Sequence, residues 1–338
     1  MRRRHFLLRF SPCILALSAA TAAASSLAHN LTERAEVQRF IAEVAAKHRF
    51  EKSELTRLFE QVEIRPEILE AISRPAEAKP WYEYRPIFLT RDRIQEGRQF
   101  ILDHLDILQK AESRFGVPKE IIAAIIGVET KYGRYKGRYR VIDSLTTLGF
   151  EYPRRARFFR RELVEFLLLT REEQVDPLTL RGSYAGAMGQ PQFISSSFRR
   201  WAVDFDGDNK RDIWTSTADT IGSVANYFKE HGWRPGEMVT LKARPTATAA
   251  TLKFDDDLKP NYTLSHLKTR GLRFTGDGLS PDHKAAVITL ETRNGPEYWL
   301  GFHNFYVISR YNHSAMYAMA VYQLSQELKS ATQAVATP

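Results

Sequence analysis

The sequence is organised around one apolar stretch, Pro118-Lys-Glu-Ile-Ile-Ala-Ala-Ile-Ile-Gly-Val-Glu129-Thr-Lys-Tyr-Gly133. Between Ile121 and Val128 apolar residues occupy every side of a helix, a pattern typical of a helix that is buried all round. Pro118 suits a first helical turn, and Gly133 can end the helix in the left-handed conformation. We therefore expect a buried helix between these two residues.

Glu129 places a single carboxyl group at the end of this apolar run. A carboxyl group without water resists ionisation, so its pKa should rise and it could stay protonated near neutral pH. That is the chemistry of a general acid. Glu129 also lies near the helix C-terminus, two residues before Lys131, and could equally face solvent or form a structural ion pair. The helix alone leaves both interpretations open.

The first 28 residues have the features of a cleaved signal peptide. Arg2 to Arg4 precede an apolar segment from Phe10 to Ala20, and small residues follow at 22–24 and 26–28. The apolar segment is too short to span a bilayer comfortably. The arginines leave both the Sec and the twin-arginine export routes open. We expect residues 1–28 to be removed on export to the periplasm.

Cys13 is the only cysteine, and it lies inside the predicted signal peptide. The mature chain then has no disulfide, thiol nucleophile or thiolate metal site. Ser11 and Pro12 match a lipoprotein cleavage box poorly, so we expect no lipid anchor. No other segment approaches the ~18 apolar residues of a transmembrane helix. The sequence thus predicts a soluble periplasmic protein without disulfides.

The composition, with a hydrophobic fraction of 43% and a charged fraction of 26%, is that of a globular protein. Its 338 residues allow one large domain or two to three small ones. Removing the four arginines of the signal peptide, which contains no acids, lowers the net charge from +9 to +5. Modest basicity favours a polyanionic partner. The absence of a long Lys/Arg block, together with export, argues against nucleic acid.

The spacing of apolar residues predicts a mainly helical protein. The predicted helices are two between Leu31 and Ile72, one over Arg91–Phe115 that ends at Gly116, one around Arg157–Thr170, one over Thr215–His231, and one or two between Asn304 and Thr332. Ser53 is expected to cap the second helix and Pro66 to end it. Pro75–Pro80 is a predicted linker. The aromatic residues from Trp81 to Pro86 show no period, and they either pack as a loop on the core or form a cleft wall.

A different pattern, typical of strands, appears between Met238 and Gly301. Short alternating runs occupy Val239–Ala243, Ala286–Leu290 and Tyr298–Gly301, and the turn sequences Gly276–Gly278 and Asn294–Pro296 lie beside them. We therefore predict a mainly α protein with a small β subdomain inserted between helices, an α+β fold.

The segment from Ser183 to Ser195 interleaves small and polar residues, which lets the backbone approach a ligand closely. Ser183 and Gln192 could hydrogen-bond sugar hydroxyls, amides or the Glu129 carboxyl group. The alternative is a tight turn that packs on the next helix, with Ser195 as its cap.

The segment from Asp204 to Trp214 resembles the calcium loop of an EF-hand. Asp204, Asp206 and Asp208 occupy loop positions 1, 3 and 5, and Lys210 would supply a backbone carbonyl at position 7. Carboxylates this close repel one another unless a cation lies between them. Two positions depart from the pattern, since Asn209 replaces the usual glycine and Thr215 the closing glutamate. We expect Asp219 to close a structural Ca²⁺ site, the alternative being a solvated acidic turn.

No second carboxylate accompanies Glu129 in its motif, although glycosidases ordinarily use a pair. Asp143 and Glu151 lie downstream, and their surroundings favour neither.

Taken together, these stretches resemble the lytic murein transglycosylase B family. The matching motifs are Ile126–Gly133, Pro153–Arg155, Ser183–Gly189, Pro191–Phe193, Ala202–Asp208, Ile221–Phe228 and Arg310–Ala320. The resemblance implies a lysozyme-like helical core with an EF-hand-like loop. It divides the mature chain into a helical part at 29–75, a catalytic core at 76–235, the β subdomain at 236–302 and C-terminal helices at 303–338 that complete the core.

The resemblance also implies an enzyme that cleaves peptidoglycan without water. The β-1,4 bond from N-acetylmuramic acid to N-acetylglucosamine would break and leave a 1,6-anhydromuramic end. One Glu would protonate the leaving oxygen and then deprotonate the C6 hydroxyl, which accounts for the missing second carboxylate. A hydrolytic muramidase and a non-catalytic Ca²⁺-dependent peptidoglycan-binding protein remain as alternatives. No catalytic cofactor is expected, and cell-wall synthesis or division proteins are possible partners.

Carried over by position, the resemblance makes Glu129 the acid and base, with Ser183 and Gln192 beside it. Arg154 and Arg155 would meet the lactyl or peptide carboxylates of the substrate. The remaining substrate-binding residues would be Tyr84, Met188, Phe193, Tyr227, Tyr311, Asn312 and Tyr317. Gln190 and Pro191 replace a more usual aromatic residue and glycine, so the loop could bind its sugar differently.

Overall fold

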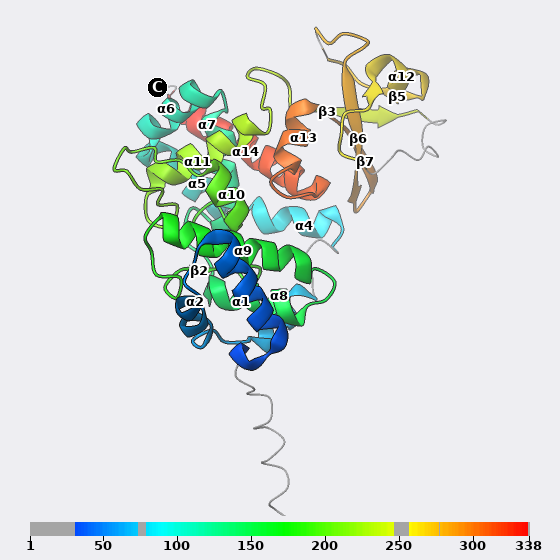
Figure 1. The fold of residues 1–338 in the computed structure, drawn as a ribbon. Helices are drawn as coiled ribbons and strands as arrows, with labels where there is room; N and C mark the ends of the chain where they lie inside the picture. The colour runs from blue at the N-terminus through cyan, green and yellow to red at the C-terminus, as the bar shows by residue number, and fades with distance from the viewer. Residues whose placement is uncertain (1–30, 74–78, 247–256, 277, 337–338) are drawn as a thin grey trace, which may run out of the picture. The chain divides into compact units, whose positions relative to one another are not determined.

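The computed structural model describes residues 31–73, 79–246, 257–276 and 278–336 (Figure 1). The predicted signal peptide at 1–28, part of the Pro75–Pro80 linker and the centre of the Gly276–Gly278 turn lie outside these residues. The chain divides into two compact units, one up to Glu63 and one from Ile64 onward.

The first unit contains a short 3₁₀ helix, η2 (Leu31–Glu33), followed by α1 (Ala35–His48) and α2 (Lys52–Phe59). The predicted apolar stripe of α1 is buried, and Phe40 packs against Phe59 with ring centroids 5.9 Å apart. The prediction that Ser53 caps α2 is wrong. The helix begins one residue earlier, after an extended Glu51, so Ser53 lies inside the first turn.

The helices of the second unit confirm a mainly α fold with a small β subdomain. They are α3 (Pro66–Ile72), α4 (Trp81–Phe88), α5 (Arg91–Asp103), α6 (Leu105–Phe115), α7 (Lys119–Thr130), α8 (Val141–Glu151), α9 (Ala156–Glu172), α10 (Ser195–Trp201), α11 (Thr217–Glu230), α12 (Leu264–Thr269), α13 (His303–Ser309) and α14 (Ala315–Ala336). In the described part of the chain, no helix is both long and apolar enough to cross a membrane.

Apart from the ends of α7, two predicted helix boundaries in this unit are wrong. Pro66 does not end a helix but begins α3, where its missing N–H costs nothing. The long helix predicted over Arg91–Phe115 breaks at His104 into α5 and α6. The break lets α5 pack on α14 while α6 packs on α11.

The aromatic stretch from Trp81 is a helix, α4, and not a loop without period. It contains Pro86 and packs on α14 and on a strand of the β subdomain. Trp81 and Tyr84 are buried in that contact, which explains why so aromatic a sequence becomes helical.

The central helix α7 is buried along nearly its whole length and packs on α5, α6, α11 and α14. Pro118 is its N-cap, one residue outside the predicted first turn. The left-handed stop comes at Lys131, two residues before the predicted Gly133. Tyr132 is also left-handed, and its hydroxyl donates to the Arg93 carbonyl at 3.1 Å. The packing of this tyrosine ring, 5.4 Å from Phe100, offsets the backbone strain.

The β subdomain is a five-stranded antiparallel sheet in the order β4-β6-β7-β3-β5. Its strands are β3 (Thr240–Pro245), β4 (Tyr262–Thr263), β5 (Leu272–Arg273), β6 (Lys284–Thr292) and β7 (Gly295–Gly301). The three predicted strands correspond to β3, β6 and β7. The sequence did not predict α12, which packs Leu264 and Leu267 on one face of this sheet. A further two-stranded sheet pairs β1 (Tyr139–Arg140) with β2 (Arg181–Gly182).

Candidate active site

Glu129 lies in the last turn of α7, where the apolar core ends and its side chain keeps part of its surface exposed. The Tyr317 hydroxyl at the start of α14 donates a hydrogen bond of 2.5 Å to Glu129 Oε1. Burial raises the pKa of Glu129 to about 7, against the opposing effect of this hydrogen bond. The carboxyl group can therefore hold a proton at neutral pH and also release one, as the sequence suggested for a general acid.

A cluster of tyrosine rings extends from this hydrogen bond. The Tyr317 ring stacks on Tyr311 with centroids 6.5 Å apart, and Tyr311 contacts Tyr227 at 4.7 Å and Phe193 at 5.9 Å. Burial, followed by the nearby Glu129 charge, raises the pKa of both Tyr311 and Tyr317 well above the usual value. These hydroxyl groups stay protonated and act as hydrogen-bond donors.

Two hydrogen bonds, one of them buried, hold the Ser183–Ser195 loop beside Glu129. The Thr130 hydroxyl donates to the Gln190 carbonyl at 2.9 Å and accepts from the Gly133 amide at 3.0 Å. The Tyr311 hydroxyl donates to the Pro191 carbonyl at 2.6 Å. Thr130 therefore joins the end of α7 to the loop, a role that was not predicted from the sequence. A hydroxyl side chain directly after the apolar run of α7 was the feature of the sequence that could have indicated this role.

The loop itself is a tight backbone turn closed by paired amides and carbonyls of Met188 and Phe193, at 2.8 and 3.0 Å. Gly189 and Gln192 have positive φ, and a Cβ atom on Gly189 would lie 2.6 Å from the Ile213 carbonyl oxygen. A side chain therefore does not fit at Gly189. The Met188 and Phe193 side chains are buried, so they anchor the loop to the protein core.

The Ser183 and Gln192 side chains make their hydrogen bonds within the loop region. Ser183 Oγ accepts from the amides of Ala185 at 3.2 Å and Ala187 at 3.1 Å. Gln192 Nε2 donates to the carbonyls of Lys136 and Gly189. Both side chains are partly exposed, and no hydrogen bond among the described residues joins either of them to Glu129. Ser195 is the first residue of α10, and Ile194 takes the cap position that had been considered for it.

Of the other predicted substrate-binding residues, Tyr84 and Asn312 lie near the tyrosine cluster, whereas Arg154 and Arg155 do not contact it in the described residues. Tyr84 on α4 is buried and lies close enough to Tyr317 to affect its pKa. Asn312 is partly exposed beside Tyr311. Arg154 and Arg155 are exposed at the start of α9, where the Arg155 guanidinium stacks 4.4 Å from the Phe158 ring. No described contact joins these arginines to Glu129.

Of the two downstream carboxylates that the sequence offered, Glu151 is half-buried at the end of α8 and Asp143 is buried. Asp143 has another role, as has the buried Glu162, which the sequence did not mark. Asp143 pairs with Arg140 at 2.7 Å and Arg65 at 3.7 Å. Glu162 accepts from the Ser196 amide at 2.9 Å, at the start of α10, and burial raises its pKa. In the described residues, no carboxylate lies in hydrogen-bond contact with Glu129.

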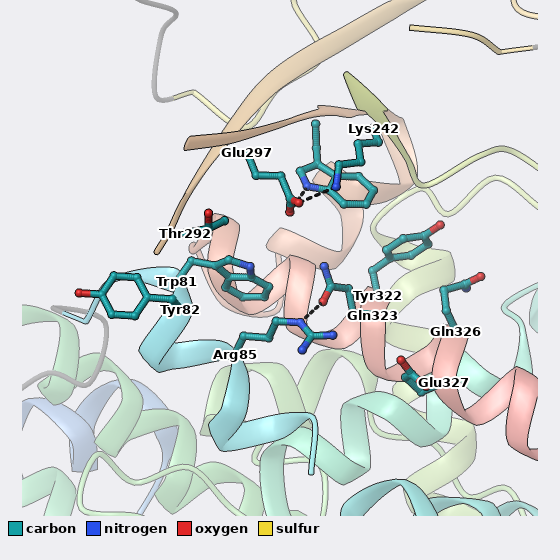
Figure 2. Close-up of a pocket in the computed structure, with 11 residues that line it drawn as sticks. Trp81, Tyr82, Arg85, Lys242, Thr292, Glu297, Tyr322, Gln323, Gln326 and Glu327 are labelled. Carbon is teal, nitrogen blue, oxygen red and sulfur yellow. Dashed lines mark hydrogen bonds and ion pairs between the residues drawn. The ribbon is translucent and has the colours of Figure 1, made fainter. Parts of the chain in front are cut away.

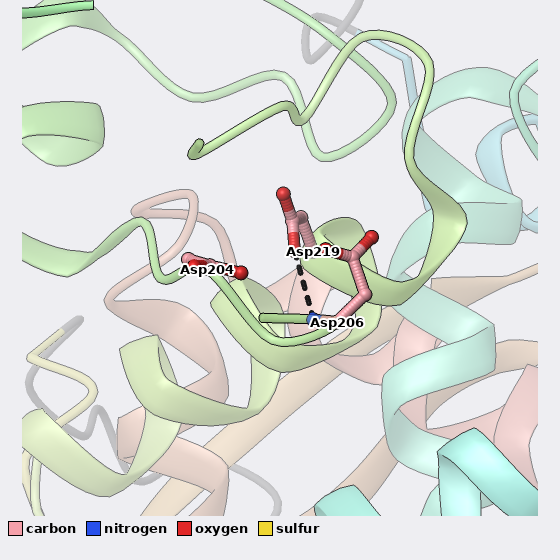
Figure 3. Close-up of side chains that lie close together, drawn as sticks. All are labelled: Asp204, Asp206 and Asp219. Carbon is pink, nitrogen blue, oxygen red and sulfur yellow. Dashed lines mark hydrogen bonds between the residues drawn. The ribbon is translucent and has the colours of Figure 1, made fainter. Parts of the chain in front are cut away.

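The acidic loop brings Asp204, Asp206 and Asp219 together, with one oxygen of each within 4.8 Å of the others (Figure 3). Asp219 comes from α11 and is the residue predicted to close the site. Its Oδ1 accepts from the Phe205 amide at 2.7 Å and its Oδ2 from the Asp212 amide at 2.8 Å. This set of carboxylate oxygens fits a hard cation such as Ca²⁺.

The loop backbone accommodates the departures from the EF-hand pattern. Asn209, at the position of the usual glycine, has φ 68°, a conformation that asparagine tolerates, and its amide donates to Asp204 Oδ2 at 2.8 Å. Asp208 accepts from the Lys210 amide at 2.8 Å and lies outside the group of three carboxylates. Asp208 and the Lys210 carbonyl therefore remain predicted ligands.

Comparison with known proteins places the chain among cell-wall enzymes. The family described as "Transglycosylase SLT domain" matches residues 32–326. The membrane-bound lytic murein transglycosylase B of Escherichia coli (strain K12) is 43% identical over 299 residues, which cover 86% of this chain and 81% of that protein.

Solved structures of lytic transglycosylases also match this chain. The soluble lytic transglycosylase SltB1 from Pseudomonas aeruginosa has a TM-score of 0.82 and 52% identity, covering 88% of this chain and 99% of that one. The Escherichia coli lytic transglycosylase Slt35, in complex with calcium, has a TM-score of 0.82 and 42% identity, covering 91% of this chain and 95% of that one. The chain therefore belongs to the transglycosylase SLT domain family and is a lytic transglycosylase.

Proposed function

We propose that this enzyme cleaves the β-1,4 bond between N-acetylmuramic acid and N-acetylglucosamine in peptidoglycan, with Glu129 as its only acid and base. The observation that carries the proposal is a lone carboxyl group with a pKa of about 7, hydrogen-bonded by Tyr317 at the end of a buried helix. A group that must give up a proton and take one back works best with a pKa near the working pH.

In the first step the protonated Glu129 donates to the glycosidic oxygen, and the bond from C1 to that oxygen breaks. The N-acetyl oxygen of the muramic acid stabilises the positive charge at C1. In the second step the ionised Glu129 accepts the proton of the C6 hydroxyl while O6 bonds to C1. The 1,6-anhydro end forms without water, and Glu129 regains its proton.

The Tyr317 hydroxyl suits both steps. Its hydrogen bond favours the ionised form of Glu129, and so limits the rise in pKa that burial causes. Tyr311, Tyr227 and Tyr84 would line the sugar subsites with Asn312, Ser183 and Gln192. Met188 and Phe193 would act by supporting the loop. The exposed Arg154 and Arg155 would meet substrate carboxylates, for which a guanidinium is well suited.

The acidic loop is a proposed structural Ca²⁺ site. Asp204, Asp206 and Asp219 would hold the ion with Asp208 and the Lys210 carbonyl, and Ca²⁺ would offset the repulsion between the carboxylates. The calcium complex of the related Slt35 structure supports this. The ion would fix the start of α11, which carries Tyr227.

We also propose that residues 1–28 are a cleaved signal peptide and that the enzyme works in the periplasm. The proposed division is a helical part at 29–75, a core at 76–235 completed by 303–338, and a β subdomain at 236–302.

A pair of matched variants tests the role of Glu129. Glu129→Gln should abolish release of anhydromuropeptides from peptidoglycan, because an amide cannot donate the required proton. Glu162→Gln removes another buried glutamate whose pKa is raised, and its amide oxygen can still accept from the Ser196 amide. It should leave product release intact. Equal activity of Glu129→Gln and the parent enzyme would refute the proposal.

A further inference from the structure

The five-stranded sheet has a second face, opposite α12, whose side chains the proposed mechanism does not use. Trp299 of β7 pairs with Lys242 of β3, and Arg244 of β3 pairs with Arg273 of β5. Side chains alternate along a strand, so these four residues and Glu297 project from one face. The face therefore changes from aromatic to basic across the strands β7, β3 and β5.

The aromatic part of this face borders a cavity of about 570 Å³, formed with α4 and α14. Figure 2 shows Tyr82 and Tyr322 around it, with Arg85 and Gln326. Trp299 also lines it. The three rings are partly exposed. The cavity has the size of a small-molecule site.

Hydrogen bonds hold the walls of this cavity in place. Glu297 accepts from Lys242 Nζ at 2.6 Å and from Trp299 Nε1 at 2.8 Å, and Arg85 Nε donates to Gln323 at 2.7 Å. Side chains fixed in this way lose little conformational entropy when a ligand binds.

The chemistry of the cavity suits a sugar. Two cations, Arg85 and Lys242, balance two carboxylates, Glu297 and Glu327, so the lining favours neither a free anion nor a free cation. Aromatic faces and side-chain amides are what a neutral, hydroxyl-rich ring requires, because the rings cover its apolar face and the amides bond its hydroxyl groups.

A second cavity, of about 730 Å³, adjoins the first, since Lys242 lines both. Its lining contains Lys242, Arg244 and Arg273 from the sheet and Lys268 from α12, beside the edge strand β5, and no carboxylate. The described part of the chain gives Arg244, Lys268 and Arg273 no acidic partner. Such a cluster binds carboxylate groups. A sugar site beside a carboxylate site matches a polymer of neutral sugars that bears acidic peptides.

This surface is separate from Glu129. Tyr322 and Gln326 lie about 140° and 180° around α14 from Tyr317, at 3.6 residues per turn. The cavity therefore lies on the side of α14 away from the tyrosine that binds Glu129.

We propose that these two cavities form an accessory peptidoglycan-binding surface, with a sugar of the glycan strand in the aromatic cavity and the carboxylates of its stem peptide in the basic one. The surface holds the enzyme on the wall while Glu129 cleaves a bond at another place. This inference rests on the proposed function, because it takes peptidoglycan as the ligand.

The test is co-sedimentation of Glu129→Gln protein with insoluble peptidoglycan, which measures binding without cleavage if Glu129 is the acid and base. Soluble muropeptides in the same supernatants would show that the role of Glu129 is wrong, and the surface variants would then still be compared with one another for binding. Adding Trp299→Ala should weaken binding roughly tenfold, as loss of a central aromatic contact does. Arg244→Glu with Arg273→Glu should weaken it as much and flatten its salt dependence. Trp299→Phe, which keeps a ring, should retain most of the affinity.

Two comparisons separate the role of this surface from an effect of net charge on binding. Lys52→Glu with Arg57→Glu makes the same charge change at exposed positions of the first unit and should leave binding unchanged. On glycan stripped of stem peptides, Trp299→Ala should still weaken binding and the arginine reversals should not. Unchanged affinity in both surface variants, or equal loss in the Lys52 and Arg57 control, would overturn the proposal. Arginine reversals that still weaken binding to stripped glycan would overturn the assignment of the stem peptide.

Discussion

The raised pKa of Glu129 predicts a pH-dependent gain in stability when this residue is replaced by Gln. The pKa rises from 4.5 to about 7 on folding because burial disfavours the carboxylate. The unfolded chain therefore loses its proton at lower pH than the folded protein does, and the parent protein loses stability as the pH rises from 4.5 to 7. The difference in pKa corresponds to about 3 kcal/mol above pH 7.

Glu129→Gln keeps the shape of the side chain and an acceptor for Tyr317 but cannot ionise. The variant should thus be more stable than the parent by up to about 3 kcal/mol above pH 7, and this advantage should fade as the pH falls from 7 to 4.5. Urea denaturation of both proteins from pH 4 to pH 8.5 measures the difference. The other carboxylates are common to both proteins and cancel. A difference that stays constant with pH, or that shrinks as the pH rises, would refute the reasoning.

Three further predictions concern the groups around Glu129. Tyr317→Phe removes a hydrogen bond that favours the carboxylate, so the pKa of Glu129 should rise and the alkaline limb of the pH–rate profile should shift to a higher pH than its parent position near pH 7. A shift of this limb to lower pH would contradict the prediction. Thr130→Val leaves the Gln190 carbonyl without its hydrogen-bond donor, so the free energy of unfolding should drop by about 1–3 kcal/mol and kcat should fall more than substrate affinity. The control Thr170→Val, in α9, removes a buried hydroxyl that bonds the Leu167 carbonyl and should leave kcat unchanged. Chelation of Ca²⁺ should lower the melting temperature of the parent but not of Asp204→Asn, and equal melting curves for the parent with and without chelator would exclude a stabilising ion.

The sequence predicted those features that depend on local pattern. The apolar run before Glu129 predicted a buried helix, and the structure gives α7 over Lys119–Thr130. Alternation predicted three strands of the β subdomain, since one face of each is buried on α12. The family resemblance, rather than chemistry alone, pointed to Tyr317, because Glu129 and Tyr317 lie 188 positions apart in the chain.

Features that depend on tertiary packing escaped prediction. The helix over Arg91–Phe115 divides because its two halves contact different helices. The aromatic stretch from Trp81 becomes helical because α14 and β6 cover it. Lys131 and Tyr132 adopt left-handed conformations that glycine would ordinarily take, since the Tyr132 ring fills a space between helices. Thr130 was missed because its partner, the Gln190 carbonyl, is a backbone atom that no sequence pattern marks.

The central claim is that one carboxyl group, Glu129, performs both proton transfers and that water takes no part. Digestion of peptidoglycan in ¹⁸O-labelled water, followed by mass spectrometry of the muropeptides, tests it most directly. We predict anhydromuramic ends that are lighter by one water than reducing ends and carry no label, with no such products from Glu129→Gln. Reducing ends that contain ¹⁸O as the main product of the parent enzyme would contradict the claim.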